Sequence, residues 1–440
     1  MKNKTRTILF LAAGLILLAG MIAPLALAGE GAWEPHRASP AAVPRLSAFI
    51  NIWLETGVDN LEPAVAYNSN HDEYLVVWTN DRGATKDVYA RRVRGDGTLL
   101  SNFTISHNAN FHNYEPDVAY SPVQDEYLVV WTYDSVTPSP NSNIWARRIT
   151  WNGANLHLPQ YQEFPIGRTH DDQHNPAVAY NSDADEYLVV YQNTWGGGGQ
   201  DIDAQRVRAS DGWSPGWVNI VAGAGFRSFP DVTHCLASNY YLIAYTFQST
   251  AGGSGDIYSK AASWNLGYLG SEEHICDDTH DQSRVAVAAS ASEYLAVWED
   301  APNLSTTEIY ARRVAADGTP QGPGGGFWIA GSSNRHDSTP AVADGHGYGY
   351  LIVWDRWAIW PDSDVYGRYA MPGRDAAAGP EFALDNDVQE QMFPAVACDT
   401  FGNCLMAEED GNSAGGDLEI RGRLVWPYHL ALPLVLRQSP

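Results

Sequence analysis

Basic residues and cysteines are scarce in this sequence, and both shortages narrow its possible roles. Lys and Arg number 27 against 52 Asp and Glu, which gives a formal net charge of -25. So acidic a surface repels nucleic-acid phosphates and anionic lipids, so neither is an expected partner. Four Cys are too few for a disulfide scaffold, and no Cys-x-x-Cys pair indicates zinc. The His-Glu-x-x-His motif of metalloproteases is also absent.

The N-terminus has the pattern of a secretory signal peptide. Lys2, Lys4 and Arg6 precede an uncharged apolar run, and Ala26-Leu27-Ala28 resembles a cleavage site. We expect residues 1–28 to be removed, which leaves an extracellular or cell-surface protein without membrane insertion. An uncleaved anchor is the alternative, because about 20 apolar residues can span a bilayer. Residues 29–47, rich in Ala and Pro, are expected to form a linker.

A repeated unit fills residues 48–426. Each copy opens with a segment like Pro-x-Val-Ala, continues with one like Glu-Tyr-Leu-Val-Val-Trp, and then has one like Asp-Ile-Tyr-Ala-Arg-Arg-Val. The opening position falls at Pro63, Pro116, Pro176, Pro230, Val285, Pro340 and Pro394. Strand-like segments separated by Asn, Asp and Gly, without helical periodicity, predict an all-β fold. Seven such copies predict a seven-bladed β-propeller with four-stranded antiparallel blades.

The two ends of the repeat region predict how the ring closes. The last copy supplies three strands and has no obvious fourth one. The segment Ala48-Phe-Ile-Asn-Ile-Trp-Leu54, just before the first copy, has the character of the missing strand. We therefore expect the N-terminal strand to complete the last blade, which leaves no open sheet edge. Residues 427–440 follow as a C-terminal apolar tail.

The segments Asp-Glu-Tyr-Leu-Val-Val-Trp at 72–78 and Asp-Val-Tyr-Ala-Arg-Arg-Val at 87–93 resemble repeats of secreted bacterial β-propellers. In layout they are also similar to the propeller of the periplasmic Tol translocation protein. The resemblance covers about residues 48–426. It implies the fold but not the function, because such propellers serve binding, scaffolding and catalysis alike.

Aromatic residues of the variable loops are the first candidate ligand-binding residues. The loop between the second and third strands shares one face with the loop into the next blade. That face is expected to carry Tyr133, Trp195, Phe247, Trp357 and Trp360. Flat rings beside carboxylates can stack on sugars or peptides. The alternative is that these rings fold inward and seal the loops against the blades.

Histidines in the loops that lead into the next blade are the second set. We take His112, His174 and His336 as candidate ligand-binding residues; His170 and His280 lie in similar loops. Imidazole and carboxylate groups can bind a transition metal, but the unequal spacing favours solvated or loop-capping His. Calcium is a weak alternative at Asp201-Ile-Asp203 and Asp385-Asn-Asp387, because neither fits the twelve-residue calcium loop. No cofactor is otherwise expected.

Two further patterns predict structural roles. A cation recurs on the third strand of most copies, at Arg91, Arg147, Lys260, Arg312, Arg368 and Arg423. We interpret this column as cross-strand or inter-blade partners of carboxylates. Cys398 and Cys404 flank the first hairpin of the last copy and are expected to form a disulfide, whereas Cys235 and Cys276 are not.

These features favour a secreted or cell-surface recognition or scaffold protein that binds a carbohydrate or a protein on its variable loop face. An extracellular glycoside hydrolase is the catalytic alternative, because some propellers use two carboxylates around a central pocket. The sequence does not select such a pair, and it lacks the Ser-x-Asp-x-Gly-x-x-Trp boxes typical of sialidases. A third possibility is an extracellular assembly joined through the tail.

Overall fold

The computed structural model describes residues 43–108, 110–135, 142–154, 160, 162–167, 171–195, 198–276, 278–303, 305–359, 362–411 and 416–427. All described residues lie in one compact unit of the chain, Ala38–Pro440. The expected signal peptide, most of the linker and nearly all of the tail lie outside the described residues. Within the described part of the chain, no helix is long and apolar enough to cross a membrane.

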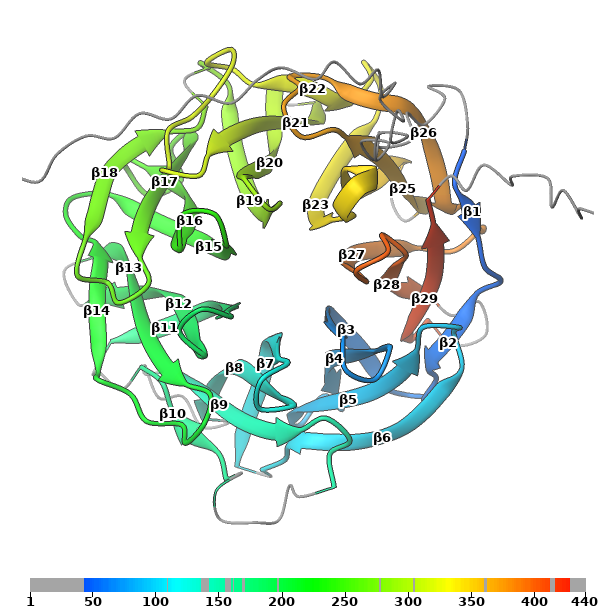
Figure 1. The fold of residues 1–440 in the computed structure, drawn as a ribbon. Helices are drawn as coiled ribbons and strands as arrows, with labels where there is room; N and C mark the ends of the chain where they lie inside the picture. The colour runs from blue at the N-terminus through cyan, green and yellow to red at the C-terminus, as the bar shows by residue number, and fades with distance from the viewer. Residues whose placement is uncertain are drawn as a thin grey trace, which may run out of the picture. The chain divides into compact units, whose positions relative to one another are not determined.

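The described strands form seven blades arranged around an axis (Figure 1). Blade 1 contains β3 (Asp59–Asn68), β4 (Glu73–Asp81), β5 (Lys86–Arg94) and β6 (Leu99–Ser106). Blade 2 contains β7 (Phe111–Ser121), β8 (Glu126–Ser135), β9 (Asn143–Thr150) and β10 (Phe164–Pro165). Blade 3 contains β11 (Asp172–Asn181), β12 (Glu186–Trp195), β13 (Gly199–Arg208) and β14 (Trp217–Val221). Blade 4 contains β15 (Phe226–Cys235), β16 (Tyr240–Gln248), β17 (Gly255–Ser263) and β18 (Leu269–His274).

The remaining blades follow the same antiparallel order. Blade 5 contains β19 (Asp281–Ala289), β20 (Glu293–Asn303), β21 (Thr306–Ala315) and β22 (Phe327–Ala330). Blade 6 contains β23 (His336–Asp344), the short 3-10 helix η2 (His346–Tyr348), β24 (Tyr350–Ile359), β25 (Asp362–Ala370) and β26 (Ala377–Asp385). Blade 7 contains β27 (Gln391–Cys398), β28 (Cys404–Gly411) and β29 (Leu418–Trp426). A single parallel bridge, Thr307 to His336, joins blades 5 and 6.

The N-terminal segment closes the ring, as the sequence predicted. Strands β1 (Arg45–Leu46) and β2 (Ile50–Trp53) both pair with β29, so chain segments from the two ends of the repeat region share blade 7. The inner strand β27 also packs against β3 of blade 1. Arg45 and Leu46 belong to this sheet, so the segment expected to be a linker up to residue 47 ends before Arg45.

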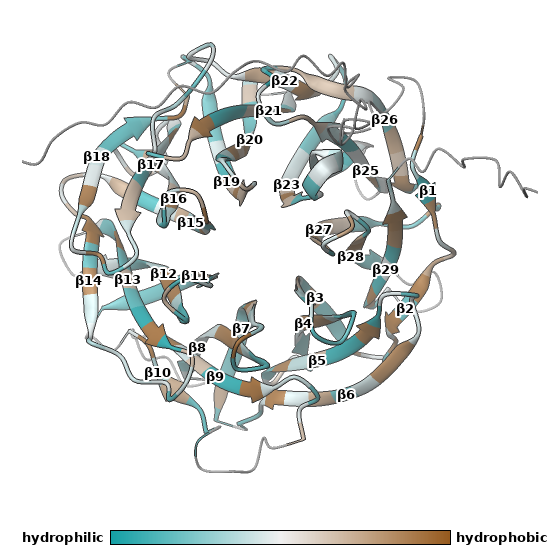
Figure 2. Ribbon diagram, in the orientation of Figure 1, coloured by the Kyte–Doolittle hydropathy of each residue, from teal (hydrophilic) through white to brown (hydrophobic). Residues whose placement is uncertain are grey.

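The second strand of each blade is buried on both faces because blades stack on either side of it. In β4, every residue from Tyr74 to Trp78 has no exposed surface. Most strands show apolar and polar bands in turn (Figure 2). Six blades bury an aromatic residue at one position of this strand: Trp78, Trp131, Tyr191, Tyr245, Trp298 and Trp354. Blade 7 has Glu408 there instead, fully buried.

The recurring cations join blades as predicted, but the hydrogen bonds described for them are accepted by main-chain carbonyls rather than by carboxylates. The Nη1 of Arg91 donates to the carbonyl oxygen of Ile52 in blade 7. The equivalent cations also donate to main-chain oxygens of the preceding blade's outer strand: Arg147 to Ile105, Lys260 to Ile220, Arg312 to Ile275, Arg368 to Ile329 and Arg423 to Leu384. These carbonyls lie where strand pairing ends, so they need a donor. The carboxylate of Glu73 pairs with the next residue, Arg92, which points to the opposite face.

The cysteines have the arrangement expected from the sequence. Cys398 and Cys404 are joined by a disulfide, with their Cα atoms 3.9 Å apart across the first hairpin of blade 7. Cys235 and Cys276 are not disulfide-bonded, and both are buried.

Candidate functional site

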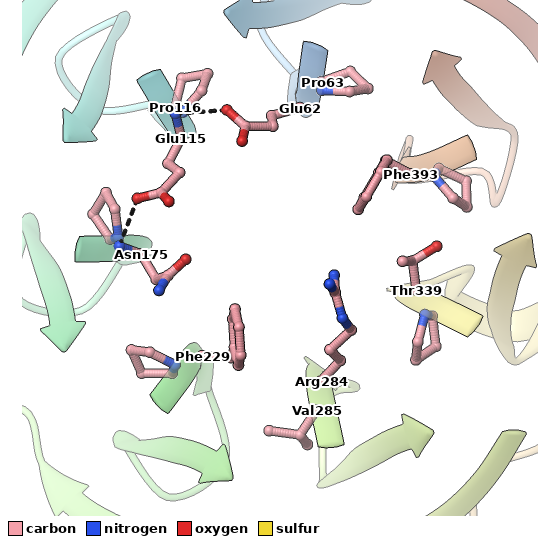
Figure 3. Close-up of a pocket in the computed structure, with 14 residues that line it drawn as sticks. Glu62, Pro63, Glu115, Pro116, Asn175, Phe229, Arg284, Val285, Thr339 and Phe393 are labelled. Carbon is pink, nitrogen blue, oxygen red and sulfur yellow. Dashed lines mark hydrogen bonds between the residues drawn. The ribbon is translucent and has the colours of Figure 1, made fainter. Parts of the chain in front are cut away.

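A ring of seven residues surrounds the propeller axis, one from the inner strand of each blade (Figure 3). This axial ring consists of the residues before the repeated Pro position: Glu62, Glu115, Asn175, Phe229, Arg284, Thr339 and Phe393. All seven have a positive φ, from 46° at Thr339 to 56° at Glu62. An L-residue adopts this left-handed conformation at a cost of about 1–2 kcal/mol.

A β-bulge explains the geometry of the axial ring. The inner strand begins before the Pro, at Asp59 in blade 1, rather than at the Pro as its sequence suggested. Its pairing with the second strand skips residues 62 and 63, and the same break recurs in the other six blades. A bulge redirects one side chain and removes the need for the N–H that Pro lacks. Here it directs the ring residue into the channel.

The axial ring lines a cavity of about 460 Å³. Its wall is chemically uneven, because two carboxylates and an amide come from blades 1 to 3 whereas Arg284 projects from blade 5 (Figure 3). Phe229 and Phe393 lie to either side of that arginine. The backbone bulge is the same in every blade, so it belongs to the framework. The side chains differ, so they can give the cavity specificity.

The carboxylates of Glu62 and Glu115 join neighbouring blades. Oε2 of Glu62 accepts the backbone N–H of Glu115 at 2.8 Å and the Thr79 hydroxyl at 2.9 Å. Oε2 of Glu115 accepts the backbone N–H of Asn175 at 2.9 Å and the Thr132 hydroxyl at 2.7 Å. Burial, followed by the charge of Glu115, raises the pKa of Glu62. Among the described residues, Oε1 of Glu62 and Oε1 of Glu115 accept no hydrogen bond.

In blades 5 and 7, a carboxylate on the second strand accepts the backbone N–H of the ring residue in the next blade. Glu299 Oε1 accepts the N–H of Thr339 at 2.7 Å, and Glu409 Oε1 accepts the N–H of Glu62 at 2.7 Å. In blade 6, Asp355 likewise receives the N–H of Phe393. Burial raises the pKa of Glu409 to about 8, with a further contribution from the nearby charge of Glu62. These acids therefore serve first to lock the ring residues of adjacent blades in place.

Arg284 is the only cation among the residues that line this cavity. Its guanidinium lies 5.4 Å from the Phe229 ring centre and 5.7 Å from that of Phe393, which fits cation–π contact. Its Nε is 3.7 Å from Oε1 of Glu299, which is too long for a hydrogen bond. Among the described residues, no hydrogen bond is made by the Arg284 side chain, so its donor fork faces the cavity.

Two further acids lie two residues beyond the axial ring. Asp117 accepts the N–H of Val178, and Asp231 accepts the N–H of Val287, each at 2.7 Å across a blade boundary. Burial is the main cause that raises the pKa of Asp117 to about 7 and that of Asp231 to about 6.

The predicted aromatic residues stay in separate blades, and most pack against other side chains. Tyr133 stacks on Phe111 at 4.3 Å and lines a cavity of about 410 Å³. Phe247 lies under Arg227 at 4.9 Å, and Trp357 stacks on His336 at 4.1 Å. Trp195 is 39% exposed. Trp360 lies outside the described residues. A single aromatic platform on the loop face is therefore not formed by the described members of this set.

The predicted histidines are likewise spread over several blades. His174 bonds Ser142 Oγ at 2.8 Å, and Nδ1 of His112 has no hydrogen-bond partner within the described structure. His336 lines a second cavity, of about 380 Å³, together with His280. His170 lies outside the described residues.

One group among the described residues has the spacing for a metal, Asp278, His280 and Asp300, whose ligand atoms lie within 4.8 Å of one another. Nδ1 of His280 is already hydrogen-bonded to Asp300 at 2.8 Å. At the two predicted calcium positions the acids contact protein donors. Asp203 accepts bonds from two Asn side chains, and Asp387 pairs with Arg421 at 2.6 Å.

A nucleophile motif is present in the sequence but not in the context that catalysis needs. Gly411-Asn-Ser-Ala-Gly415 matches Gly-x-Ser-x-Gly. The nucleophile elbow of hydrolases lies between a strand and a helix. Here the segment connects the antiparallel strands β28 and β29, and residues 412–415 lie outside the described structure.

Sequence reasoning missed the axial ring, although a signal for it was present. The residue before the repeated Pro changes in charge and size from copy to copy, whereas the Pro and the three residues after it largely repeat. A position that varies within a constant frame on the inner strand is where a propeller can build a specific site. That signal was overlooked because the inner strand was taken to start at the Pro.

Neither a protein-family model nor a curated protein matches the sequence. Among solved structures, a protein of unknown function from Dyadobacter fermentans DSM 18053 is similar, with a TM-score of 0.51 and 10% identity over 87% of this chain and 99% of that chain. The propeller domain of the Trilobed protease from Pyrococcus furiosus has a TM-score of 0.46 and 10% identity over 84% and 96% of the two chains. The Hadza microbial sialidase Hz136 has a TM-score of 0.46 and 9% identity over 80% and 76%. At 10% identity the likeness to the Dyadobacter protein shows a shared fold alone.

Proposed function

We propose that this protein is a non-enzymatic recognition or scaffold propeller, exported to the cell exterior, that binds a carbohydrate or protein ligand in its axial cavity and on the adjoining loop face. The axial cavity is the observation that carries the proposal. Its framework repeats in all seven blades, while the axial ring presents acidic, amide, aromatic, cationic and hydroxyl groups at equivalent positions. A concave site with a few convergent polar groups is the usual form of a ligand pocket.

The hydrogen bonds that the acids accept favour binding over catalysis. Glu62, Glu115 and Glu299 each accept a backbone N–H of the next blade, so their positions serve the ring. A glycoside hydrolase would need one free acid and one free base on either side of a substrate.

A glycan and peptide array screen of the protein without residues 1–28, with calcium or a chelator, tests the proposal. Phe393→Ala removes one wall of the axial cavity, and Trp195→Ala alters the exposed loop face. We expect specific binding that Phe393→Ala weakens. Binding that neither variant changes, or hydrolysis of an arrayed glycan, would contradict a non-enzymatic axial site.

Export and assembly need their own tests. N-terminal sequencing of protein secreted with its own leader should find Gly29 as the first residue. Light scattering measures the oligomeric state of the protein with and without residues 427–440. An unchanged oligomeric state would mean that the tail is not an assembly element.

A further inference from the structure

The two sides of the axial cavity carry opposite charges. On each side, some donors or acceptors of the charged side chains make no hydrogen bond to the described residues. On one side, the Arg284 guanidinium is held between two phenyl rings, and among the described residues its N–H groups make no hydrogen bond. Glu299 forms an ion pair with Arg284, with 3.7 Å between Nε and Oε1, and its two oxygens accept the Thr339 N–H and the Ser283 hydroxyl. Because this ion pair is too long for a hydrogen bond, the N–H groups of the arginine fork are open to an external acceptor. Its planar donor pattern matches a carboxylate.

The opposite side of the cavity carries Glu62 and Glu115 (Figure 3). In each of them Oε2 holds the neighbouring blade, as described above, and Oε1 is left without a hydrogen bond among the described residues. Fixing one oxygen orients the other. Two carboxylates from adjacent blades thus form a site for a cationic donor such as an ammonium group.

The wall between these poles suits a backbone with amide groups. Asn175 provides an amide, Thr339 a hydroxyl, and the phenyl rings of Phe229 and Phe393 provide flat apolar surface next to the arginine. Phe229 is 40% exposed, so its face is open to the cavity.

From this arrangement we infer that the axial cavity binds a zwitterionic ligand, a short peptide with free termini, through its carboxylate at Arg284 and its ammonium group at Glu62 and Glu115. The inference rests on the proposed recognition function and specifies its ligand. An acidic sugar would satisfy Arg284 and its hydroxyl groups would donate to the two glutamates, but it would leave their negative charges without a compensating cation. A peptide supplies the cation that this side requires, and its last side chain can pack on the phenyl rings.

Native mass spectrometry of the protein lacking residues 1–28 tests the inference. The probes are a tripeptide library with free termini, the same library with amidated C-termini, and the same library with acetylated N-termini. We expect retention of the free library and a loss of about ten- to hundred-fold in affinity on either modification, as for loss of a charge-assisted hydrogen bond. Calorimetry on the best-retained tripeptide then gives the affinity.

The following variants distinguish the loss of a charged group from a loss of folding. Arg284→Asn suits the left-handed backbone at φ 51° and should abolish the preference for the free carboxylate. Arg284→Lys keeps the charge without the fork and should give an intermediate affinity. Glu62→Gln should abolish the preference for the free ammonium group, and circular dichroism monitors folding. Trp217→Ala, an exposed residue of the outer strand β14, should leave binding unchanged.

The outcomes distinguish this inference from the proposed function. Equal binding of the amidated library, or unchanged binding by Arg284→Asn, would overturn the zwitterion site while leaving an axial recognition site intact. Retention of a neutral glycan instead, weakened by Phe393→Ala, would have the same meaning. Failure of every probe to bind in a Phe393-dependent way would overturn both.

Discussion

The backbone N–H of Glu115 donates a 2.8 Å hydrogen bond to Oε2 of Glu62, and this bond joins two neighbouring blades. The same glutamates face the axial cavity. The same side chains therefore stabilise the ring and supply the negative charge of the site. Because Oε2 of each glutamate is hydrogen-bonded to the protein, only Oε1 is left to contact a ligand.

The first prediction concerns this inter-blade bond. Glu62→Ala should lower the free energy of unfolding by about 1–3 kcal/mol, because it leaves the Glu115 N–H and the Thr79 hydroxyl without their acceptor. Glu62→Gln keeps an acceptor oxygen and should cost less. Urea unfolding followed by tryptophan fluorescence measures both, and equal losses for the two variants would show that charge, not the acceptor, matters.

The second prediction concerns pH. Burial and the facing carboxylate of Asp385 raise the pKa of Glu408 well above its usual value, and burial raises that of Glu409 to about 8. In the unfolded chain both groups lose their protons near pH 4.5. The folded protein retains those protons to higher pH, so this contribution to stability is present at low pH and is lost as pH rises from about 4.5 through about 8.

Glu408→Gln tests that assignment, because an amide cannot ionise. The groups around it are Asp385, Asp410 and Arg421. The variant should be more stable than the wild type at pH 8 and nearly equal to it at pH 4.5, as measured by Tm across this range. A variant that is less stable at pH 8 would show that the Glu408 carboxylate has a cationic partner.

The third prediction concerns the disulfide of blade 7. It closes a loop with a sequence separation of 6, so its removal should cost about 2 kcal/mol by the chain-entropy relation. The double variant Cys398→Ala, Cys404→Ala and the reduced wild type should therefore have similar, lowered Tm values. If the reductant lowers the Tm of the double variant as well, a second disulfide that includes Cys235 or Cys276 would be indicated.

The fourth prediction concerns ring closure. Ile52 is fully buried in β2, against the blade 7 sheet, although it lies far from β29 in the sequence. Ile52→Ala should destabilise the protein by about 2–5 kcal/mol, as for other buried aliphatic truncations. Val43→Ala, an exposed residue of the same segment, is the control. Similar unfolding curves for the two variants would mean that the seam contributes little.

The fold could be predicted from the sequence because each blade repeats the same apolar pattern. Counting strands in the last copy showed that one was missing and placed it at residues 48–54, and the structure has it at Ile50–Trp53. The site was harder to predict, because the loop residues Tyr133 and Trp357 look exposed in the sequence but pack on Phe111 and His336 in the structure. Ring packing depends on neighbours from other strands, which no local pattern contains.

The cation column shows a second limit of sequence reasoning. Arg91 has carboxylates close in sequence, yet it donates to the Ile52 carbonyl of another blade. Repetition in every copy indicated a structural role, but main-chain acceptors leave no trace in the sequence. The axial ring escaped notice for a related reason, because a bulge that turns Arg284 toward the axis is a property of the backbone.

The most direct test of the account is a crystal structure of the protein with the tightest ligand from the array or library screens. We expect this ligand to lie in the axial cavity, within hydrogen-bond distance of the Arg284 guanidinium or of Oε1 of Glu62. A ligand bound on the outer loops around Trp195, with the axial cavity free of it, would contradict the central claim.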